Sequence, residues 1–483
     1  MKQKSYFLTS SYLQEWKSLD KQMSLHLKYV NIPARIKASN GVWLILLLPV
    51  ALLVGAIKYK TQCSFLFWHI SLLSSSFLIN SICGMLHYAI NCQKPLKQIG
   101  TLASMTTSSL LLTLYSFEGY GVYMNILHSL VCSLCYHPLL EHLMIHVKHG
   151  FTYGEASVVT QAFLLFQIHV YTNIFLSVQD KPTNCQDTTT LILQVGLSCI
   201  IVLSTLVYTM KSLRSTLVFY SCLMLMIMFG VIIPLHIILN KSPILWMIEL
   251  LLVNTSTVYL VLYWCCCVLV AIAVISSQVS SKQKANTSLR KYFHLLAVAV
   301  YVPGFVFNRC LLHLASGIVL ALFLCLEMMR LLRLPPLSDI LNQGFQLYVD
   351  EKDTSLALTP IYLLVGCSLP MWITPRPLEE TDVLTLSAGV LSIGVGDCFA
   401  SIVGYKWGKH KWKNSSKSLE GSAACFLTQC LFIILFAYLD LVPRDSIYYG
   451  TFGIAVVTLI EAKTDQVDNL ALPLVQFCLF LLG

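Results

Sequence analysis

The residues best suited to chemistry lie in the last third of the chain, where charged side chains interrupt long apolar runs. Asp397 ends an apolar run that is spaced by Gly389, Gly394 and Gly396. An ionisable residue there is expected near a membrane interface, where it is a functional candidate by default. Carboxylate oxygens suit Mg²⁺, which proteins usually hold through one or two carboxylates together with substrate phosphates. Asp397 is therefore a predicted metal ligand, with a snorkelling or helix-capping aspartate as the alternative.

A cationic loop follows Asp397 and leads into another apolar run. Unpaired backbone N–H groups at the start of a helix attract phosphate, so the loop and the next helix suit a nucleotide. Lys417 is the best single candidate to contact phosphates, although the spacing is not that of a Walker A loop. A polybasic patch facing lipid is the alternative for the lysines. Close helix packing would account for Ala400, Gly404 and Gly408, which recur at four-residue spacing. The candidate nucleotide-binding residues of the loop are Tyr405, Lys406, Gly408, Lys409, Lys411, Lys413, Ser416, Lys417, Ser418 and Glu420.

Other polar segments hold groups that would complete a metal–phosphate site. Glu327 and Arg330 lie near the end of an apolar run at i and i+3, a spacing that lets them form an ion pair. Two further groups are a cationic cluster with an imidazole at the start of one run, and carboxylates with an amide around the last loop. They consist of Arg290, Lys291 and His294, and of Glu461, Asp468 and Asn469.

Membrane-spanning helices must position these segments. The chain has 483 residues, of which 56% are hydrophobic and 11% are charged, whereas roughly a quarter of an ordinary soluble domain is charged. Apolar runs long enough to cross a bilayer recur along the chain, about 13 to 15 of them. They include the predicted spans at 101–117, 244–275 and 384–404. The expected fold is an all-α, polytopic integral membrane protein. The 18 cysteines are scattered through apolar runs and are expected to be buried free thiols.

The placement of charges divides the chain into three parts. Residues 1–40 are polar and basic, and they are expected on the cytosolic side as either an amphipathic surface helix or a disordered tail. Residues 41–275 form a multi-span region with short loops and isolated histidines that are expected to be structural. Residues 276–483 form the multi-span region that holds the candidate catalytic groups. The formal net charge of +9 fits a membrane face that meets phosphate or anionic lipid.

The order of the apolar runs places the polar loops of the catalytic region on one side of the membrane. These loops are residues 276–290, 330–355, 405–420 and 462–469, which hold most of the basic residues of that region. The opposite turns hold only Arg309, Arg376 and Arg444, beside several carboxylates. By the positive-inside rule, the lysine-rich side is cytosolic. The candidate site is therefore expected to have access to cytosolic nucleotides and metal.

Several of these segments resemble the polyprenol and phytol kinase family, which is related to CDP-diacylglycerol synthases. The signature consists of Gly396-Asp397, Ala400-Ser401, Gly404, Gly408, Lys417-Ser418 and Glu420-Gly421-Ser422. Dolichol kinases are the most similar members, through RKYFHL (290–295), YVDEKD (348–353), IYLLVGCSLPMWITPRP (361–377), GVGDCFASIVG (394–404) and QVDNLALP (466–473). Thr354-Ser355 departs from the serine-glycine pair common in the family, and the amino-terminal half carries little of the resemblance.

The resemblance implies a CTP-dependent kinase that phosphorylates dolichol at the cytosolic face of the endoplasmic reticulum membrane. The product, dolichyl phosphate, would supply the lipid carrier for protein N-glycosylation and related mannose transfer. CTP is the implied co-substrate, with Mg²⁺ or another divalent cation as cofactor. Dolichol and membrane lipid are the other implied partners, no nucleic acid is expected, and the oligomeric state stays open.

The site residues divide by expected role. The predicted catalytic residues are Asp397, Lys417, His294 and Asp468. The predicted metal ligands are Asp397 and Asp468, with support from Glu461 and Asn469. Arg290 and Lys291 would position the phosphates or the lipid hydroxyl. The general base stays open between Asp397 and His294, because a metal-bound carboxylate cannot easily also take a proton.

Two alternatives remain within the same chemistry and one outside it. Another prenol or phytol kinase would act on a different lipid alcohol, and a cytidylyltransferase would release pyrophosphate instead of transferring the terminal phosphate. An anion transporter would place ionisable groups near the bilayer midplane, whereas here they cluster at one surface.

Overall fold

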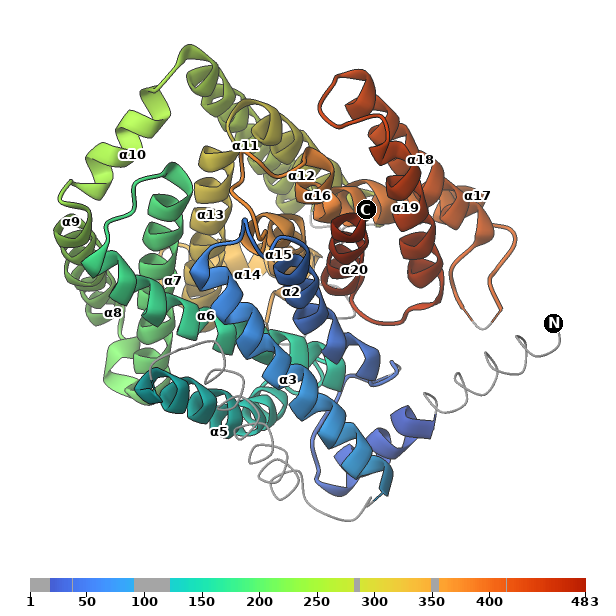
Figure 1. The fold of residues 1–483 in the computed structure, drawn as a ribbon, viewed down its shortest axis with the longest axis horizontal. Coiled ribbons are helices and arrows are strands. Elements are labelled where there is room, and N and C mark those ends of the chain that lie inside the picture. The colour runs from blue at the N-terminus through green and yellow to red at the C-terminus, as the bar shows by residue number, and fades with distance from the viewer. Residues whose placement is uncertain (1–17, 37, 91–121, 282–286, 349–355, 414) are drawn as a thin grey trace. The chain divides into compact units, whose positions relative to one another are not determined.

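The computed structural model describes residues 18–36, 38–90, 122–281, 287–348, 356–413 and 415–483 (Figure 1). Helices and their connections account for this part of the chain, apart from one isolated β-bridge between Lys411 and Ser418. A bilayer offers no partner for exposed backbone polar groups, and a helix satisfies them within its own segment. The chain folds into two compact units, one of which contains Met1–His169 and the short later segment Asp465–Val467.

The first unit is built from helices of the amino-terminal region. Residues 18–29 are helical with Met23 and Leu27 buried, which confirms a helix within the basic segment, whereas residues 1–17 lie outside the described part. Next, α2 packs against α3, and α3 packs against α5 (Figure 1). The bounds are η1 (Val42–Leu46), α2 (Leu47–Lys58), α3 (Phe65–Ile90), α5 (Val122–His146) and α6 (Tyr153–Gln179), whose last part belongs to the second unit.

The second unit opens with helices that keep much of their apolar surface exposed. Only 6% of the apolar window in Thr216–Leu239 is buried, and only 11% of that in α11, as expected of helices that face lipid. Asn254 divides the predicted run at 244–275, because its side chain accepts from the Thr257 N–H at 2.7 Å and so caps α11. The bounds are α7 (Cys185–Thr209), η2 (Lys211–Arg214), α8 (Thr216–Leu225), η3 (Met226–Ile232), α9 (Ile233–Leu239), α10 (Pro243–Leu252) and α11 (Thr255–Ser281).

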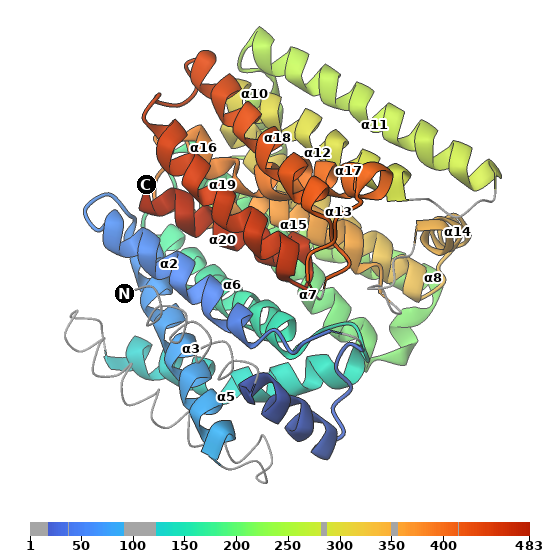
Figure 2. The same cartoon turned by 90° about the vertical axis from the view of Figure 1, so that its right-hand side faces the viewer.

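Several of the remaining helices of the second unit pack around η4, a π-helical segment whose residues are all buried. Neighbours of η4 include α12, α15, α18 and α20, and Figure 2 shows α18, α19 and α20 lying side by side. The bounds are α12 (Thr287–Phe307), α13 (Arg309–Leu331), α14 (Ser338–Tyr348), α15 (Leu358–Trp372), α16 (Val383–Leu386), η4 (Val390–Asp397), α17 (Cys398–Trp407), α18 (Leu419–Tyr438), α19 (Ser446–Lys463) and α20 (Asp468–Leu482).

The helices confirm an all-α, polytopic membrane protein. Within the described ranges, 7 helices are long and apolar enough to cross a bilayer, and shorter apolar helices accompany them. The predicted span at 101–117 lies outside the described residues, and the predicted span at 384–404 consists of α16, η4 and α17. The predicted boundary at residue 275 separates a region without candidate catalytic groups from the region that holds them. It does not describe the two compact units, and it stays a prediction.

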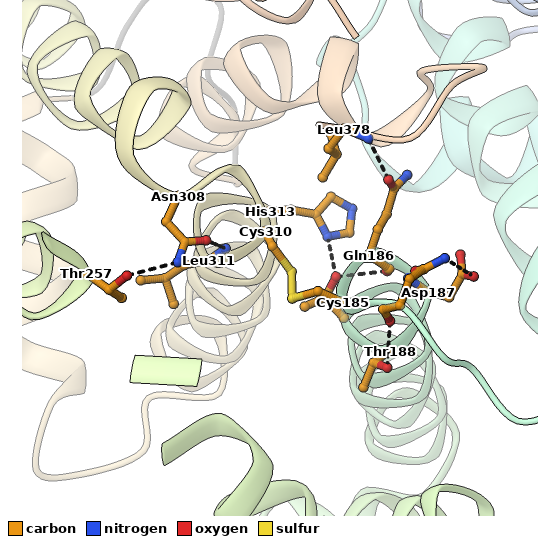
Figure 3. The surroundings of a disulfide bond; sticks show 12 residues. Cys185, Gln186, Asp187, Thr188, Thr257, Asn308, Cys310, Leu311, His313 and Leu378 are labelled. Carbon is orange, nitrogen blue, oxygen red and sulfur yellow. Dashed lines mark hydrogen bonds between the residues drawn. A yellow bond between two sulfur atoms is a disulfide. The ribbon is translucent and has the colours of Figure 1, made fainter. Parts of the chain in front are cut away.

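A disulfide corrects the expectation that the cysteines are free thiols. Cys185 at the start of α7 is bonded to Cys310 at the start of α13 (Figure 3). Other cysteines of the described ranges are free. The pairing left no local signal in the sequence, because 125 positions separate the two residues.

Hydrogen bonds gather further chain segments around the disulfide. Nδ1 of His313 in α13 lies 3.0 Å from the hydroxyl of Thr189 in α7. Figure 3 shows Gln186, whose side chain accepts from the Leu378 N–H at 2.7 Å. Arg309 donates to the Leu378 carbonyl at 2.7 Å. The starts of α7 and α13 and the turn before α16 therefore lie at one end of the second unit, as the order of the apolar runs predicts for the latter two.

Candidate active site

Asp397 lies at the end of η4 and is 5% exposed. Lys291, from the first turns of α12, forms an ion pair with its Oδ2. His294, one turn further along α12, directs Nε2 at the same oxygen from 3.5 Å. Ser401 donates to Oδ1 at 3.4 Å. A buried carboxylate is tolerated only when it is paired and hydrogen-bonded, and these three side chains meet that requirement.

The glycine-spaced run brings Asp397 into the helical bundle. A Cβ at Gly394 would lie 2.7 Å from Val298 of α12, and one at Gly396 would lie 2.5 Å from Gln429 of α18. These two glycines therefore allow η4 to approach both helices. π-helical turns are rare and often occur at functional sites, which fits their position directly before Asp397.

Lys417 joins the loop to the last two helices. Its Nζ lies 2.8 Å from Oε1 of Glu461, at the end of α19, and 3.3 Å from Asp468, the first residue of α20. It also donates to the Glu461 carbonyl at 2.7 Å. Burial alone would lower the pKa of Lys417, but Asp468 and Glu461 outweigh it and raise the pKa above its ordinary value. Lys417 is therefore a fixed positive charge at neutral pH.

The two groups of charges form one cluster. η4, which ends at Asp397, packs against α19 and α20, and Asp397 is among the carboxylates that raise the pKa of Lys417. We call the set the charged cluster, which consists of Lys291, His294, Asp397, Lys417, Glu461 and Asp468. It unites residues from α12, η4, the 408–418 loop, α19 and α20. The cluster contains all four predicted catalytic residues.

The lysines around the loop between α17 and α18 have two different environments: Lys417 faces the charged cluster, and the others are exposed. Trp412 N–H donates to the Lys417 carbonyl at 3.0 Å, and Leu419 N–H donates to the His410 carbonyl at 2.8 Å, so the loop doubles back on itself. This arrangement turns Lys417 inward, whereas the loop's other predicted cations are exposed. The exposed predicted residues are Tyr405 and Lys406, which the structure places in the last turn of α17, and Lys409, Lys411, Lys413 and Ser416 of the loop. One lysine of the loop therefore belongs to the charged cluster, and the others present positive charge to solvent.

Three predicted nucleotide-binding residues shape the loop. The Ser418 hydroxyl accepts from the Gly421 N–H at 3.1 Å and caps α18, and Ser418 is buried. A Cβ at Gly408 would lie 2.6 Å from that hydroxyl, so Gly408 permits close packing. Glu420 accepts from His410 Nδ1 at 2.7 Å and from the backbone N–H of the same residue. These contacts are structural, and nucleotide contacts by the three residues stay predictions.

The remaining predicted residues lie beside the cluster. Arg290 precedes Lys291 in α12, and Asn469 follows Asp468 in the first turn of α20; both are half-buried. Glu327 and Arg330 form the predicted ion pair at 2.7 Å, and Glu327 also accepts from the Ala357 N–H at 2.8 Å. This pair anchors the chain connection that leads into α15.

The predicted metal ligands do not form a preassembled metal centre. Over the described ranges, no group of three or more His, Cys, Asp and Glu side chains is placed to hold an ion. Lysine ammonium groups lie against Asp397, Glu461 and Asp468 instead. The donor chemistry still fits Mg²⁺, because proteins hold this ion through one or two carboxylates together with substrate phosphates.

Sequence reasoning identified the main charged residues but missed Ser401 as a hydrogen-bond donor to Asp397. Its position four residues after Asp397, on the same helical face, was the available signal. The sequence also gave no indication that Lys291 pairs with Asp397 rather than with a phosphate. That pairing depends on the packing of α12 against η4, which are far apart in the chain.

Comparisons with known proteins agree on one family. The family profile described as Dolichol kinase matches residues 122–355. The dolichol kinase of Bos taurus is 35% identical over 373 residues, 73% of this chain and 69% of the bovine protein. That of Homo sapiens is 36% identical over 353 residues, 69% of this chain and 65% of that protein. Dolichol kinase EVAN of Arabidopsis thaliana is 27% identical over 377 residues, 73% of this chain and 61% of that protein.

The chain spans about two thirds of the length of these curated relatives. The matched profile range contains Lys291 and His294 and ends before Asp397. No solved structure matches the chain.

Proposed function

This chain belongs to the dolichol kinase family, and we propose that it transfers the terminal phosphate of CTP to the hydroxyl of dolichol. The observation that carries this proposal is the charged cluster, in which Lys291 of α12 and Lys417 of the 408–418 loop face carboxylates. Phosphoryl transfer requires alignment of the reactants and neutralisation of charge on the transferred group, with little covalent chemistry by the protein. Lys291 and Lys417, which pair with carboxylates of the cluster, would supply that neutralisation.

When the nucleotide binds, the side chains of the charged cluster would leave one another and contact the nucleotide phosphates and the metal ion. Lys417 would turn from Glu461 and Asp468 toward the nucleotide phosphates, while the exposed lysines of the loop attract the anion from solution. Asp397 and Asp468, supported by Glu461 and Asn469, would hold Mg²⁺. A bound Mg²⁺ would neutralise phosphate oxygens and orient the phosphate chain. Once a nucleotide is bound, the lysines would therefore contact its phosphates and the carboxylates would hold the metal ion.

His294 is the best-placed general base. When Nε2–H faces Asp397, Nδ1 is the proton acceptor, and Nδ1 is buried without a hydrogen-bond partner among the described residues. The lipid hydroxyl would give its proton to Nδ1 as its oxygen attacks the terminal phosphorus of CTP. The bond from that phosphorus to the bridging oxygen then breaks, and CDP leaves. Asp397 would orient the imidazole and stabilise its protonated form, as a buried aspartate does in catalytic triads.

The position of the disulfide supports a cytosolic orientation of the cluster. Lys291 lies near the start of α12, and Cys310 lies just after α12 ends at Phe307. At 1.5 Å per residue, roughly 24 Å of helix separates the two ends. Disulfides persist in the lumen of the endoplasmic reticulum, whereas nucleotides are available in the cytosol. The opposite placement of disulfide and cluster therefore favours the endoplasmic reticulum membrane, with dolichyl phosphate supplied to protein N-glycosylation.

The test is the transfer of label from CTP, radioactive in its terminal phosphate, to added dolichol. Membranes containing wild-type protein should label the lipid when Mg²⁺ is present. Asp397→Asn should abolish the signal, and Glu327→Gln, a half-buried acid outside the cluster, is the matched control. No label with folded wild-type protein would refute the proposal. Label in another prenol only would indicate a sibling kinase, and release of pyrophosphate would indicate a cytidylyltransferase.

A further inference from the structure

Glu155 organises a buried polar network within the first unit. Thr152 N–H donates to its Oε2 at 3.0 Å, and Glu155 N–H donates to the Thr152 hydroxyl at 3.3 Å, which forms a capping box at the start of α6. The other oxygen, Oε1, accepts from Arg35 at 2.6 Å and from the Val467 N–H at 2.8 Å. Glu155 is 0% exposed. Its charge is therefore committed to internal contacts.

The same unit holds all residues of the segment Asp465–Val467. Asp465 accepts from the backbone N–H and the hydroxyl of Ser39, each at 2.7 Å. Gln466 accepts from the Thr152 hydroxyl at 2.6 Å and donates to the Ser39 carbonyl at 3.0 Å. Val467 is held by Glu155. Each residue of the segment thus has a partner that is distant in sequence.

Two glycines permit the close approach on which these bonds depend. Gly41 has a φ of 61°, and a Cβ there would collide with the Gln466 side chain. Gly154 donates its N–H to the Asn40 carbonyl at 2.8 Å. A Cβ at Gly154 would overlap the Gly41 carbonyl. The backbone is therefore shaped for contact between these segments.

The held segment connects two carboxylates of the charged cluster. Glu461 lies at the end of α19, and Asp468, which begins α20, directly follows Val467. Both carboxylates contact Lys417. We propose that Glu155, together with Arg35 and Thr152, is a positioning group that fixes this connection, so that Glu461 and Asp468 are correctly aimed at Lys417. The amino-terminal unit would then contribute to catalysis without touching the substrates, and this kinetic part rests on the proposed function.

Phosphoryl transfer makes such positioning important. A displacement of about 1 Å in a catalytic constellation can cost on the order of a hundredfold in rate. Val467 is the immediate neighbour of Asp468. If the Val467 N–H lost its hydrogen bond, a shift of the backbone there would also move the Asp468 carboxylate. The side chains of Arg35 and Glu155 are only 7% and 0% exposed. The ion pair between them is therefore enclosed by protein and gives the segment a rigid support.

Hydrogen exchange followed by mass spectrometry tests the support itself, without reference to activity. In Glu155→Ala, amide exchange over residues 464–468 should accelerate by about tenfold or more, since the Val467 N–H loses its acceptor. Glu327→Ala is the matched control, because Glu327 also binds an arginine and a backbone N–H, that of Ala357, at 2.8 Å. It should leave the exchange of residues 464–468 unchanged.

A milder pair of variants keeps the test decisive if Glu155→Ala does not fold. Thr152→Val removes the hydroxyl bonded to Gln466 while keeping the side-chain volume, and Thr152→Ser retains the hydroxyl. Thr152→Val should lower kcat for CTP and dolichol by on the order of tenfold, and Thr152→Ser should stay within about twofold of wild type. The effect should be non-additive with Asp468→Asn, because both changes act through the same carboxylate.

The outcomes test the positioning role of Glu155 separately from the proposed kinase activity. Faster exchange at 464–468 with non-additive loss of kcat supports positioning by the network. Unchanged exchange in both Glu155→Ala and Thr152→Val overturns it, as does faster exchange with wild-type kcat or with fully additive losses. An inactive wild-type protein would instead overturn the kinase proposal and the kinetic part of this inference. The exchange data would then still decide whether Glu155 holds the segment.

Discussion

Nζ of Lys417 lies 2.8 Å from the carboxylate of Glu461. The sequence assigned this lysine to nucleotide phosphates and this glutamate to a metal, yet in the structure they bind each other. An ammonium group between carboxylates keeps the buried charges paired, since an isolated buried charge would be strongly unfavourable. Binding of a nucleotide with its metal would replace both partners together. We therefore expect nucleotide binding and metal binding to be coupled.

Lys417→Ala should lower kcat by on the order of a hundredfold or more, because it removes a cation from the transferring phosphate. Lys413→Ala provides the contrast on the same loop, because Lys413 is exposed and lies outside the charged cluster. It should mainly raise KM for CTP, by a few fold at most, and the effect should shrink at high salt. Initial rates over a range of CTP concentrations measure both. Equal losses of kcat in the two variants would contradict the sorting of the lysines.

His294→Asn should lower kcat by about 10²–10⁴-fold, the usual contribution of a general base, while KM for CTP changes little. The reason is that Nδ1 faces no protein partner among the described residues and is free to take the proton of the lipid hydroxyl. Asp397→Asn should impair both kcat and nucleotide affinity, because Asp397 also pairs with Lys291. Steady-state kinetics of the two variants separate these effects. Near-normal turnover by His294→Asn would remove it from the proton-transfer step.

The identity of the site residues could be predicted because charge is costly in an apolar chain. Asp397, Lys417 and Asp468 stand out in a sequence that is 11% charged, and the order of apolar runs predicts a common side of the membrane for their segments. All three lie in the charged cluster. The disposition of loop lysines was less predictable, because it depends on the hydrogen bonds that turn Lys417 inward.

Pairings over long sequence distances could not be predicted from one sequence. Cys185 and Cys310 meet because α7 packs against α13, and Glu155 meets Val467 because the chain returns to the first unit. Neither contact has a local spacing. The capping-box pattern from Thr152 to Glu155 was readable, but it does not reveal that the second carboxylate oxygen holds the connection between α19 and α20.

Asp465 gives a prediction for the dependence of stability on pH. Burial alone would raise its pKa, but the Ser39 hydroxyl and backbone N–H outweigh it and lower the pKa below its ordinary value. A lowered folded-state pKa means stabilisation that is present above the unfolded-state value, about 3.9, and lost as pH falls through the folded-state value. The difference in unfolding temperature between wild type and Asp465→Asn should therefore be largest near neutral pH and shrink below about pH 4. Thermal unfolding in detergent measures it, and a constant difference would contradict the assignment.

The disulfide gives a prediction that separates stability from catalysis. Removing a native disulfide typically costs about 2–5 kcal/mol, and this one closes a loop with a sequence separation of 125. The double variant Cys185→Ser and Cys310→Ser should unfold at a lower temperature yet keep near-normal kcat at low temperature. The reason is that Cys310 lies just after the end of α12, whereas Lys291 of the charged cluster lies near its start. Maleimide should label these two thiols of the denatured wild-type protein only after reduction. Labelling without reduction would show that the bond is absent, and it would remove the support that the disulfide gives to the orientation in the membrane.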